Sequence, residues 1–209
     1  MLIVDVVNSK QDTHRWSLDF VNTSEWHASL HPEETLHSYT DLVDWVKGKG
    51  ILSEEKAQKY LENAIKHPKE ADLVLQNAIA QREAIYRILV AVINREAIPG
   101  VDLAEFNLVL GKATCGANIV ATDEGFAWEC KLDEDSLESL VWPIILSAAE
   151  LLVSGDRQRI RQCADEQGCG WLFLDRSKNH SRRWCDMRNC GNRAKQRRHY
   201  QKGRVQPAT

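Results

Sequence analysis

The sequence lacks the features that mark several large classes of protein. No apolar run reaches membrane length, since the richest stretch, residues 137–153, contains Glu138, Pro143 and Glu150. The N-terminal residues carry neither a basic flank nor a cleavage signal, so we expect a cytoplasmic protein with no membrane partner. No Ser-His-Asp order, phosphate-binding loop or HExxH motif is present. We therefore expect a protein that is not an enzyme, and an enzyme with a structural metal stays open as an alternative.

Length and composition favour one body with a small appended module. The chain has 209 residues, of which 43% are apolar, and this suits a core of about 150 residues beside a smaller unit. Apolar residues at three- and four-residue steps predict helices over 40–47, 53–67, 69–97, 103–111 and 134–153. Pro143 should kink the last helix, and residues 117–131 read as a β-hairpin. The expected fold is mainly α with a small β-hairpin (α+β): a helical body over 1–155, a module over 156–204 and a tail over 205–209.

Four of the six cysteines have the spacing of a metal site. They form two pairs, C-x5-C and C-x4-C, with fifteen residues between the pairs: Cys163, Cys169, Cys185 and Cys190. Four thiolates suit one tetrahedral Zn²⁺ and leave no position for a reacting water. We expect one structural zinc ion per chain, which holds together a segment too short to fold alone. Cys115 and Cys130 are expected to be buried core residues.

Positive charge is concentrated around and beyond the second cysteine pair. Residues 176–204 contain eleven Lys or Arg and one acid, a formal +10 in a chain whose total is −3. This distribution is typical of a nucleic-acid-binding module on an acidic body. A cationic tail on a purely structural zinc module is the alternative. A basic zinc module is also suited to RNA, so an RNA-binding or ribosome-associated protein stays open as an alternative.

Specific runs of residues carry a family resemblance. The run from Trp184-Cys185 through Cys190-Gly191-Asn192-Arg193, preceded by residues 173–175 and 181–183, resembles the bacterial CGNR-type zinc finger. Residues 18–23 and 41–45 resemble the ABATE domain, which precedes this finger in a family of stress-induced transcription regulators. The resemblance implies zinc on all four cysteines and a regulator that binds duplex DNA. A small-molecule effector and a homodimer are further partners that it leaves open.

Within the module we expect a treble-clef-like arrangement. Residues 171–174 and 183–185 read as paired strands, and a helix should run from Gly191 to about His199, with almost no apolar face. Arg193 and Arg197 lie four residues apart on this helix, so we assign them the best chance of touching bases. The other expected nucleic-acid contacts are Arg176, Arg182, Arg183, Arg188, Lys195 and Arg198.

A regulator needs a signal, and the body is the larger candidate for receiving it. Polar side chains within an apolar stretch, together with tryptophans, suggest a ligand pocket formed by Asp19, Asn22, Trp26 and Trp128. A packed body that only dimerises is an equal alternative. The histidines at 27, 31 and 37 are irregularly spaced, and we expect them at the surface.

Overall fold

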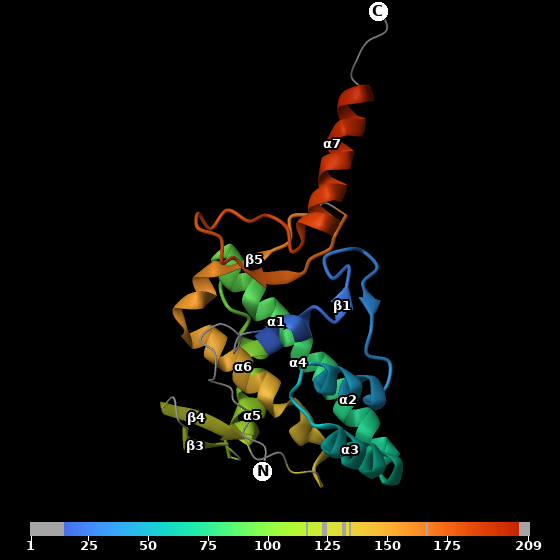
Figure 1. The fold of residues 1–209 in the computed structure, drawn as a ribbon, viewed down its shortest axis with the longest axis vertical. Coiled ribbons are helices and arrows are strands. Elements are labelled where there is room, and N and C mark those ends of the chain that lie inside the picture. The colour runs from blue at the N-terminus through green and yellow to red at the C-terminus, as the bar shows by residue number, and fades with distance from the viewer. Residues whose placement is uncertain are drawn as a thin grey trace, which may run out of the picture.

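The computed structural model describes residues 15–115, 117–122, 125–130, 133, 135–165 and 167–204. As expected, the fold is mainly α with small antiparallel strand pairs (Figure 1). The α-helices are α1 (Arg15–Val21), α2 (Tyr39–Gly48), α3 (Glu54–Lys66), α4 (Pro68–Asn94), α5 (Gly100–Cys115), α6 (Trp142–Val153) and α7 (Asn192–Arg204).

The strands form three antiparallel pairs in the described part of the chain. They are β1 (Ser24–Glu25) with β2 (Glu33–Glu34), β3 (Ala117–Thr122) with β4 (Gly125–Cys130), and β5 (Ile160–Gln162) with β6 (Leu172–Leu174). Two 3-10 turns, η1 (Leu137–Val141) and η2 (Gly155–Arg159), flank α6, and a π turn, η3 (Met187–Gly191), precedes α7.

Helix α4 is the long spine against which α1, α2, α3 and α5 pack. Its inner face divides the core into two clusters, one with α2, α3 and η1, and one with α1, α5 and α6. Pro68 occupies its first turn, where the missing N–H costs nothing. Ser38 and Ser53 cap α2 and α3 with their side chains, and α2 begins at Tyr39, one residue before the expected start at residue 40.

The β3–β4 hairpin forms as expected, whereas α6 differs from the expected helix. The hairpin forms with Ala117 opposite Cys130, and it lies at the opposite end of the molecule from α7 (Figure 1). The expected kinked helix over 134–153 is wrong in one respect, because Pro143 sits in the first turn of α6, after η1. A proline there starts a new helix instead of bending an existing one.

The first cysteine pair lies in the turn between β5 and β6. Ile160 pairs with Leu174, and Gln162 pairs with Leu172, so the expected pairing of 171–174 with 183–185 is wrong. Burial explains the difference. Ile160 and Leu172 are each 1% exposed and belong to the core cluster of α1, α5 and α6, so this strand pair is attached to the body by its apolar side.

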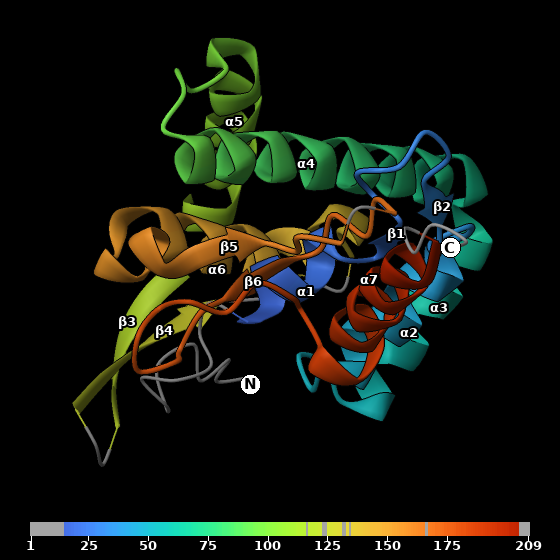
Figure 2. The same cartoon turned by 90° about the horizontal axis from the view of Figure 1, so that it is seen from above.

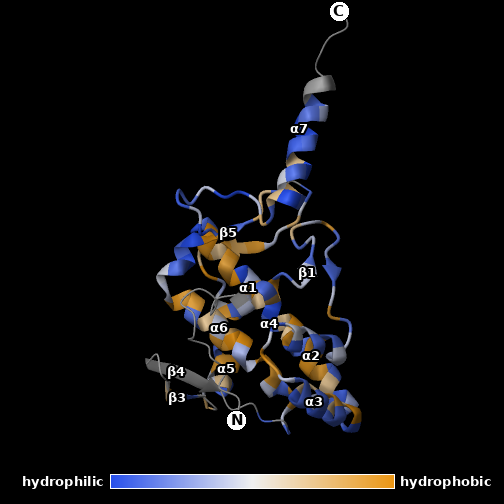
Figure 3. Cartoon of the chain, in the orientation of Figure 1, coloured by the Kyte–Doolittle hydropathy of each residue, from blue (hydrophilic) through white to orange (hydrophobic). Residues whose placement is uncertain are grey.

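Helix α7 projects away from the rest of the molecule (Figure 1). Its residues are hydrophilic on nearly every side, in contrast to the apolar inner faces of α4 and α6 (Figure 3). Cys115 is exposed at the end of α5, which corrects its expected burial; the side chain of Cys130 falls outside the described residues. Among the described helices, none combines the length and the apolar character needed to cross a bilayer.

Candidate metal centre and nucleic-acid interface

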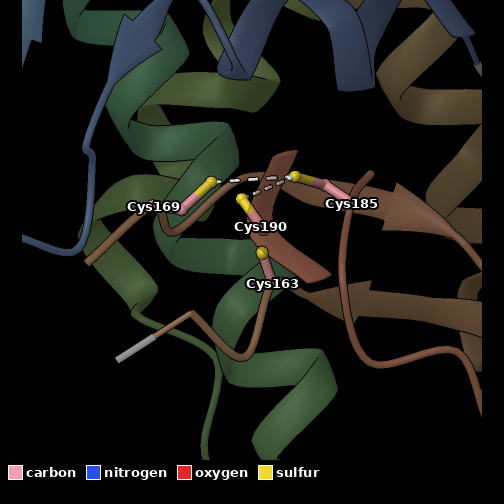
Figure 4. A group of neighbouring side chains, drawn as sticks. All are labelled: Cys163, Cys169, Cys185 and Cys190. Carbon is pink, nitrogen blue, oxygen red and sulfur yellow. Dashed lines mark hydrogen bonds between the residues drawn. The ribbon is translucent and has the colours of Figure 1, made fainter. Parts of the chain in front are cut away.

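The sulfur atoms of the two cysteine pairs converge on one point (Figure 4). The four Sγ atoms of Cys163, Cys169, Cys185 and Cys190 lie within 4.8 Å of one another. The Cys169–Cys185 and Cys185–Cys190 sulfur distances are 3.7 Å and 3.6 Å. A tetrahedral zinc ion with Zn–S bonds of 2.3 Å requires S···S separations of about 3.8 Å. The donor set therefore fits zinc in number, chemistry and spacing.

The cluster also needs a cation for electrostatic reasons. Hydrogen bonds with Cys169 and Cys185 lower the pKa of Cys163. Hydrogen bonds with Cys163 and Cys169 raise the pKa of Cys185, and burial raises the pKa of Cys190 to about 12. Four thiolates so close together repel one another, and a divalent cation offsets that repulsion when all four ionise.

A loop of the body holds the turn that carries Cys169. The backbone N–H groups of His27 and Ala28 donate to the carbonyls of Cys169 and Gly168, both at 3.1 Å. Gly168 and Gly170 have φ of +92° and +69°. A Cβ on Gly168 would lie 2.7 Å from Ser29 Cα, and one on Gly170 would lie 2.5 Å from Ala28 N. Glycine is therefore required on both sides of Cys169 by conformation and by space.

Charged side chains on α4 form ion pairs with the body loop over 24–34. Arg82, with its side chain 3% exposed, pairs with Glu34 at 2.6 Å and with Glu83 at 2.9 Å. Glu83 in turn lies 2.7 Å from His27 Nε2, and His27 is only 6% exposed. The expectation that His27 lies at the surface is therefore wrong, because its ring packs against Tyr86 with centroids 3.6 Å apart.

Tyr86 and Asn22 fasten the strands on either side of the first cysteine pair. Tyr86 Oη donates to the Gly170 carbonyl at 3.1 Å and accepts from Gln162 Nε2 at 2.7 Å. The Asn22 amide donates to the Leu172 carbonyl and accepts from the Leu172 N–H, both at 2.9 Å. The body thus satisfies β6 backbone groups that would otherwise have no strand partner on that side.

The second cysteine pair opens directly into helix α7. The Asp186 side chain accepts from the backbone N–H groups of Arg188 and Asn189, which caps η3. Cys190 lies in η3, and α7 begins two residues later at Asn192. Trp171 and Trp184 pack beside the cysteines as the small core of this unit.

The inner face of α7 carries two arginines that are paired inside the protein. The Asp165 side chain is 0% exposed and lies 2.9 Å from Arg193 and 2.7 Å from Arg197. Burial opposes its ionisation, yet hydrogen bonds from Arg197 and Arg193 lower the pKa of Asp165. Arg193 also donates to Cys190 Sγ at 2.9 Å and lies 4.7 Å from the Trp26 ring centroid. These two guanidiniums fix the helix to the metal site, and their expected contact with bases stays a prediction.

The outer face of α7, together with the preceding turn η3, presents a different set of polar residues. Arg188, Lys195 and Arg198 are exposed, and no ion pair with any of the three occurs in the described part of the chain. A groove of about 480 Å³ runs along this face, lined by Trp184, Met187, Gly191, Asn192, Lys195, Arg198 and His199. Helical steps of three and four residues explain the division into two faces.

The other expected cationic contacts lie in the loop between β6 and η3. Arg182 and Arg183 are exposed, and their guanidiniums stack on Phe173 and Trp184 at 4.7 Å and 5.3 Å from the ring centroids. Arg182 also donates to the carbonyls of Trp184 and Cys185. Within the residues that the structure describes, neither guanidinium forms an ion pair with a carboxylate. Arg176 is exposed in the same loop.

The four residues of the expected ligand pocket do not come together. Asn22 binds Leu172, and Asp19 pairs with Lys49 at 2.7 Å. Both line a cavity of about 460 Å³ between α1 and β6, whereas Trp26 lines a separate cavity of about 210 Å³ beside the cysteines. Trp128 belongs to β4 at the far end of the molecule (Figure 1), and its side chain falls outside the described residues. Sequence reasoning missed Asp165, Arg82 and Glu83, because only tertiary contacts give them their roles.

Family comparisons agree with this architecture. The model of the ABATE family, described as "Putative stress-induced transcription regulator", matches residues 14–155. The chain belongs to this family. The model of the CGNR zinc finger matches residues 159–203, which include all four cysteines. No curated protein matches the chain.

Replacing one cysteine of the CGNR finger should remove the metal. We expect Cys185→Ser to lose bound zinc, because three thiolates cannot saturate the tetrahedral site. Cys115→Ser is the matched control, since Cys115 is exposed and lies outside the cluster. Elemental analysis of the purified proteins should give one zinc per chain for the wild type and for Cys115→Ser. Full zinc occupancy in Cys185→Ser would contradict this ligand set.

The contact between finger and body should tolerate no side chain at Gly170. We expect Gly170→Ala to lower the free energy of unfolding by about 2–4 kcal/mol, because it combines a left-handed φ with overpacking against Ala28. Gly155→Ala is the control, since a Cβ there meets nothing within 4 Å. Urea denaturation of the zinc-loaded proteins, followed by circular dichroism, measures both. Equal urea midpoints for Gly170→Ala and Gly155→Ala would show that Gly170 is not in close contact with Ala28 of the body loop.

Proposed function

We propose that this protein is a transcription regulator that binds duplex DNA through the outer face of α7. The observation that carries the proposal is the separation of charge. Residues 176–204 hold a formal +10, and the chain as a whole totals −3, so the remainder is acidic. Anionic DNA is attracted to one end of such a molecule and repelled from the rest.

The shape of α7 supports a duplex as the partner. A helix that projects freely and is polar on all sides fits the major groove of B-DNA. Its inner face is already occupied by Asp165 and the metal site, so the contacts with DNA come from Arg188, Lys195 and Arg198. Arg182 and Arg183 flank the helix and supply phosphate contacts.

Removing two charges from the outer face should weaken DNA binding in a salt-dependent way. For Lys195→Gln/Arg198→Gln we expect the slope of log K against log salt to fall by about 1.8. Affinity near 0.1 M salt should drop by roughly 10- to 60-fold, because each phosphate contact contributes about 0.9 to the slope. Fluorescence anisotropy with a labelled random-sequence duplex measures both quantities.

The control variant for this experiment carries the same change in net charge. Lys66→Gln/Lys69→Gln removes two exposed cations near the junction of α3 and α4, at the end of the molecule opposite α7 (Figure 1). It should bind like the wild type. Equal loss in both variants would mean that only net charge matters. Tighter binding of the wild type to duplex or single-stranded RNA than to duplex DNA would instead favour an RNA partner.

We further propose that the cavity between α1 and β6 accepts a small-molecule effector. Its volume of about 460 Å³ is in the usual range for small ligands, and it joins the apolar Leu18 to the polar Asp19 and Asn22. Its other wall is formed by residues of the finger, including Trp171 and Phe173. A molecule bound there would contact both the body and the finger, and could favour one arrangement of the two.

Thermal-shift measurements on the zinc-loaded protein with a set of metabolites test this site. A compound present at about 100 times its Kd stabilises the fold by about 2.7 kcal/mol and should raise Tm by several degrees. Asp19→Asn should reduce the shift, whereas the more exposed Asp44→Asn should not, and an effector must also change DNA affinity. The site is refuted if no compound raises Tm, or if every hit acts equally on both variants.

A further inference from the structure

A second group of arginines lies outside α7, where the body meets the finger. Arg157, Arg159 and Arg161 alternate along η2 and β5. The buried Ile160 faces the core, while Arg157 and Arg159 are exposed and Arg161 is half-buried. The strand that anchors the finger thus carries cations on the side that faces away from the core.

The positive charges of these arginines are held in place but hardly neutralised. Arg157 donates to the Ser154 carbonyl at 2.8 Å, and Arg161 donates to the carbonyls of Gln158 and Ile160, both at 2.8 Å. A carbonyl acceptor orients a guanidinium without cancelling its charge. Arg159 lies 3.5 Å from Asp156 in a pair that is 49% and 30% exposed, and such surface pairs offset little of the charge.

Arg159 and Arg161 lie on one wall of a cleft, and His180 of the finger lies on the other. The cleft has a volume of about 420 Å³ and is lined by Gly155, Asp156, Gln158, Arg159, Arg161 and His180. His180 adopts a left-handed backbone with φ of 48° and belongs to the loop that also carries the exposed Arg176 and Lys178. Two arginines of one segment and a histidine of another therefore line one concave surface, with Arg176 and Lys178 in the same loop as the histidine.

A buried carboxylate fixes the finger side of this cleft. Asp175 is 0% exposed and accepts hydrogen bonds from the Ser177 N–H and hydroxyl and from the Arg182 N–H. Burial opposes its ionisation, yet these hydrogen bonds lower the pKa of Asp175. The loop is thus held in one conformation, so the cleft is preorganised for an anion and loses little conformational entropy on binding.

We propose that this cleft, lined by Arg159, Arg161 and His180, is a second contact surface for the phosphodiester backbone of the duplex that α7 binds. The inference rests on the proposed DNA-binding function. Strand β5 lies at the end of the body from which α7 projects (Figure 1), and viewed from above the β5–β6 pair lies to one side of α7 (Figure 2). A duplex with α7 in its major groove therefore extends across the cleft, and phosphate contacts there fix the orientation of the protein on the duplex.

The test compares two pairs of substitutions in the zinc-loaded full chain, again with a random-sequence duplex. Arg159→Gln/Arg161→Gln should lower the salt slope by about 1–2 and affinity by several-fold or more near 0.1 M salt. Lys66→Gln/Lys69→Gln, with the same loss of charge, should change neither. Asp156→Asn removes the acid at the edge of the cleft and should have the opposite effect, tighter binding with a steeper slope.

The possible results distinguish a failure of the cleft proposal from a failure of the proposed DNA-binding function. If the wild type binds duplex DNA and Arg159→Gln/Arg161→Gln matches the control, the cleft is not a DNA contact, while the role of α7 stands. If the wild type does not bind duplex DNA, the proposed function itself fails. If inorganic phosphate at constant ionic strength raises Tm of the wild type but not of the cleft variant, and DNA affinity is equal in the two, the cleft is a site for a free anion. Should the double variant lose zinc or melt early, Arg159→Gln alone, which changes only a surface pair with Asp156, replaces it.

Discussion

The close backbone contact between residues 27–29 and the turn around Cys169 is the interaction on which the rest of the structure depends. Two N–H groups of the body donate to this turn, and two glycines allow the chains to approach. Without that approach, the carbonyls of Gly168 and Cys169 would lose their partners, and the first cysteine pair would lose its position relative to the second. A zinc ion on the four cysteines would close the finger internally, while this contact determines where the finger sits on the body.

Electrostatic pairing then decides which cations are available to a partner. Asp165 is buried between the metal site and α7 and forms ion pairs with two guanidiniums of that helix. An unpaired buried carboxylate would be costly, so Asp165 holds Arg193 and Arg197 in ion pairs, although their side chains stay 35% and 24% exposed. In the described part of the chain, the exposed Lys195 and Arg198 form no such buried pair, and Arg159 in η2 forms only a surface pair with Asp156. The positive surface is therefore shaped by internal ion pairs as much as by the number of basic residues.

Much of the architecture could be predicted from local patterns. Helical periodicity placed the body helices, the pattern of residues 117–131 placed the hairpin, and cysteine spacing indicated the metal site. The errors arose where tertiary contacts decide. The alternation in residues 160–162 and 172–174 does not say which strands pair, and the burial of Ile160 and Leu172 against α1 and α6 settles it. Likewise, the sequence does not show that Asp165 pairs with Arg193 and Arg197, because this contact joins residues about 30 positions apart.

The way in which β5 and β6 pack on the body bears on exchanging fingers between relatives. Family boundaries near residue 155 suggest a unit that could be cut at one point. The contacts describe a discontinuous unit instead: the finger together with the body loop over 24–34, Asn22, and the Arg82–Tyr86 segment of α4. A chimera joined only at residue 155 would place a foreign turn against Ser29 and Ala28. Recombination at that point should therefore succeed only between chains in which the body loop over 24–34 and the turn around Cys169 match each other.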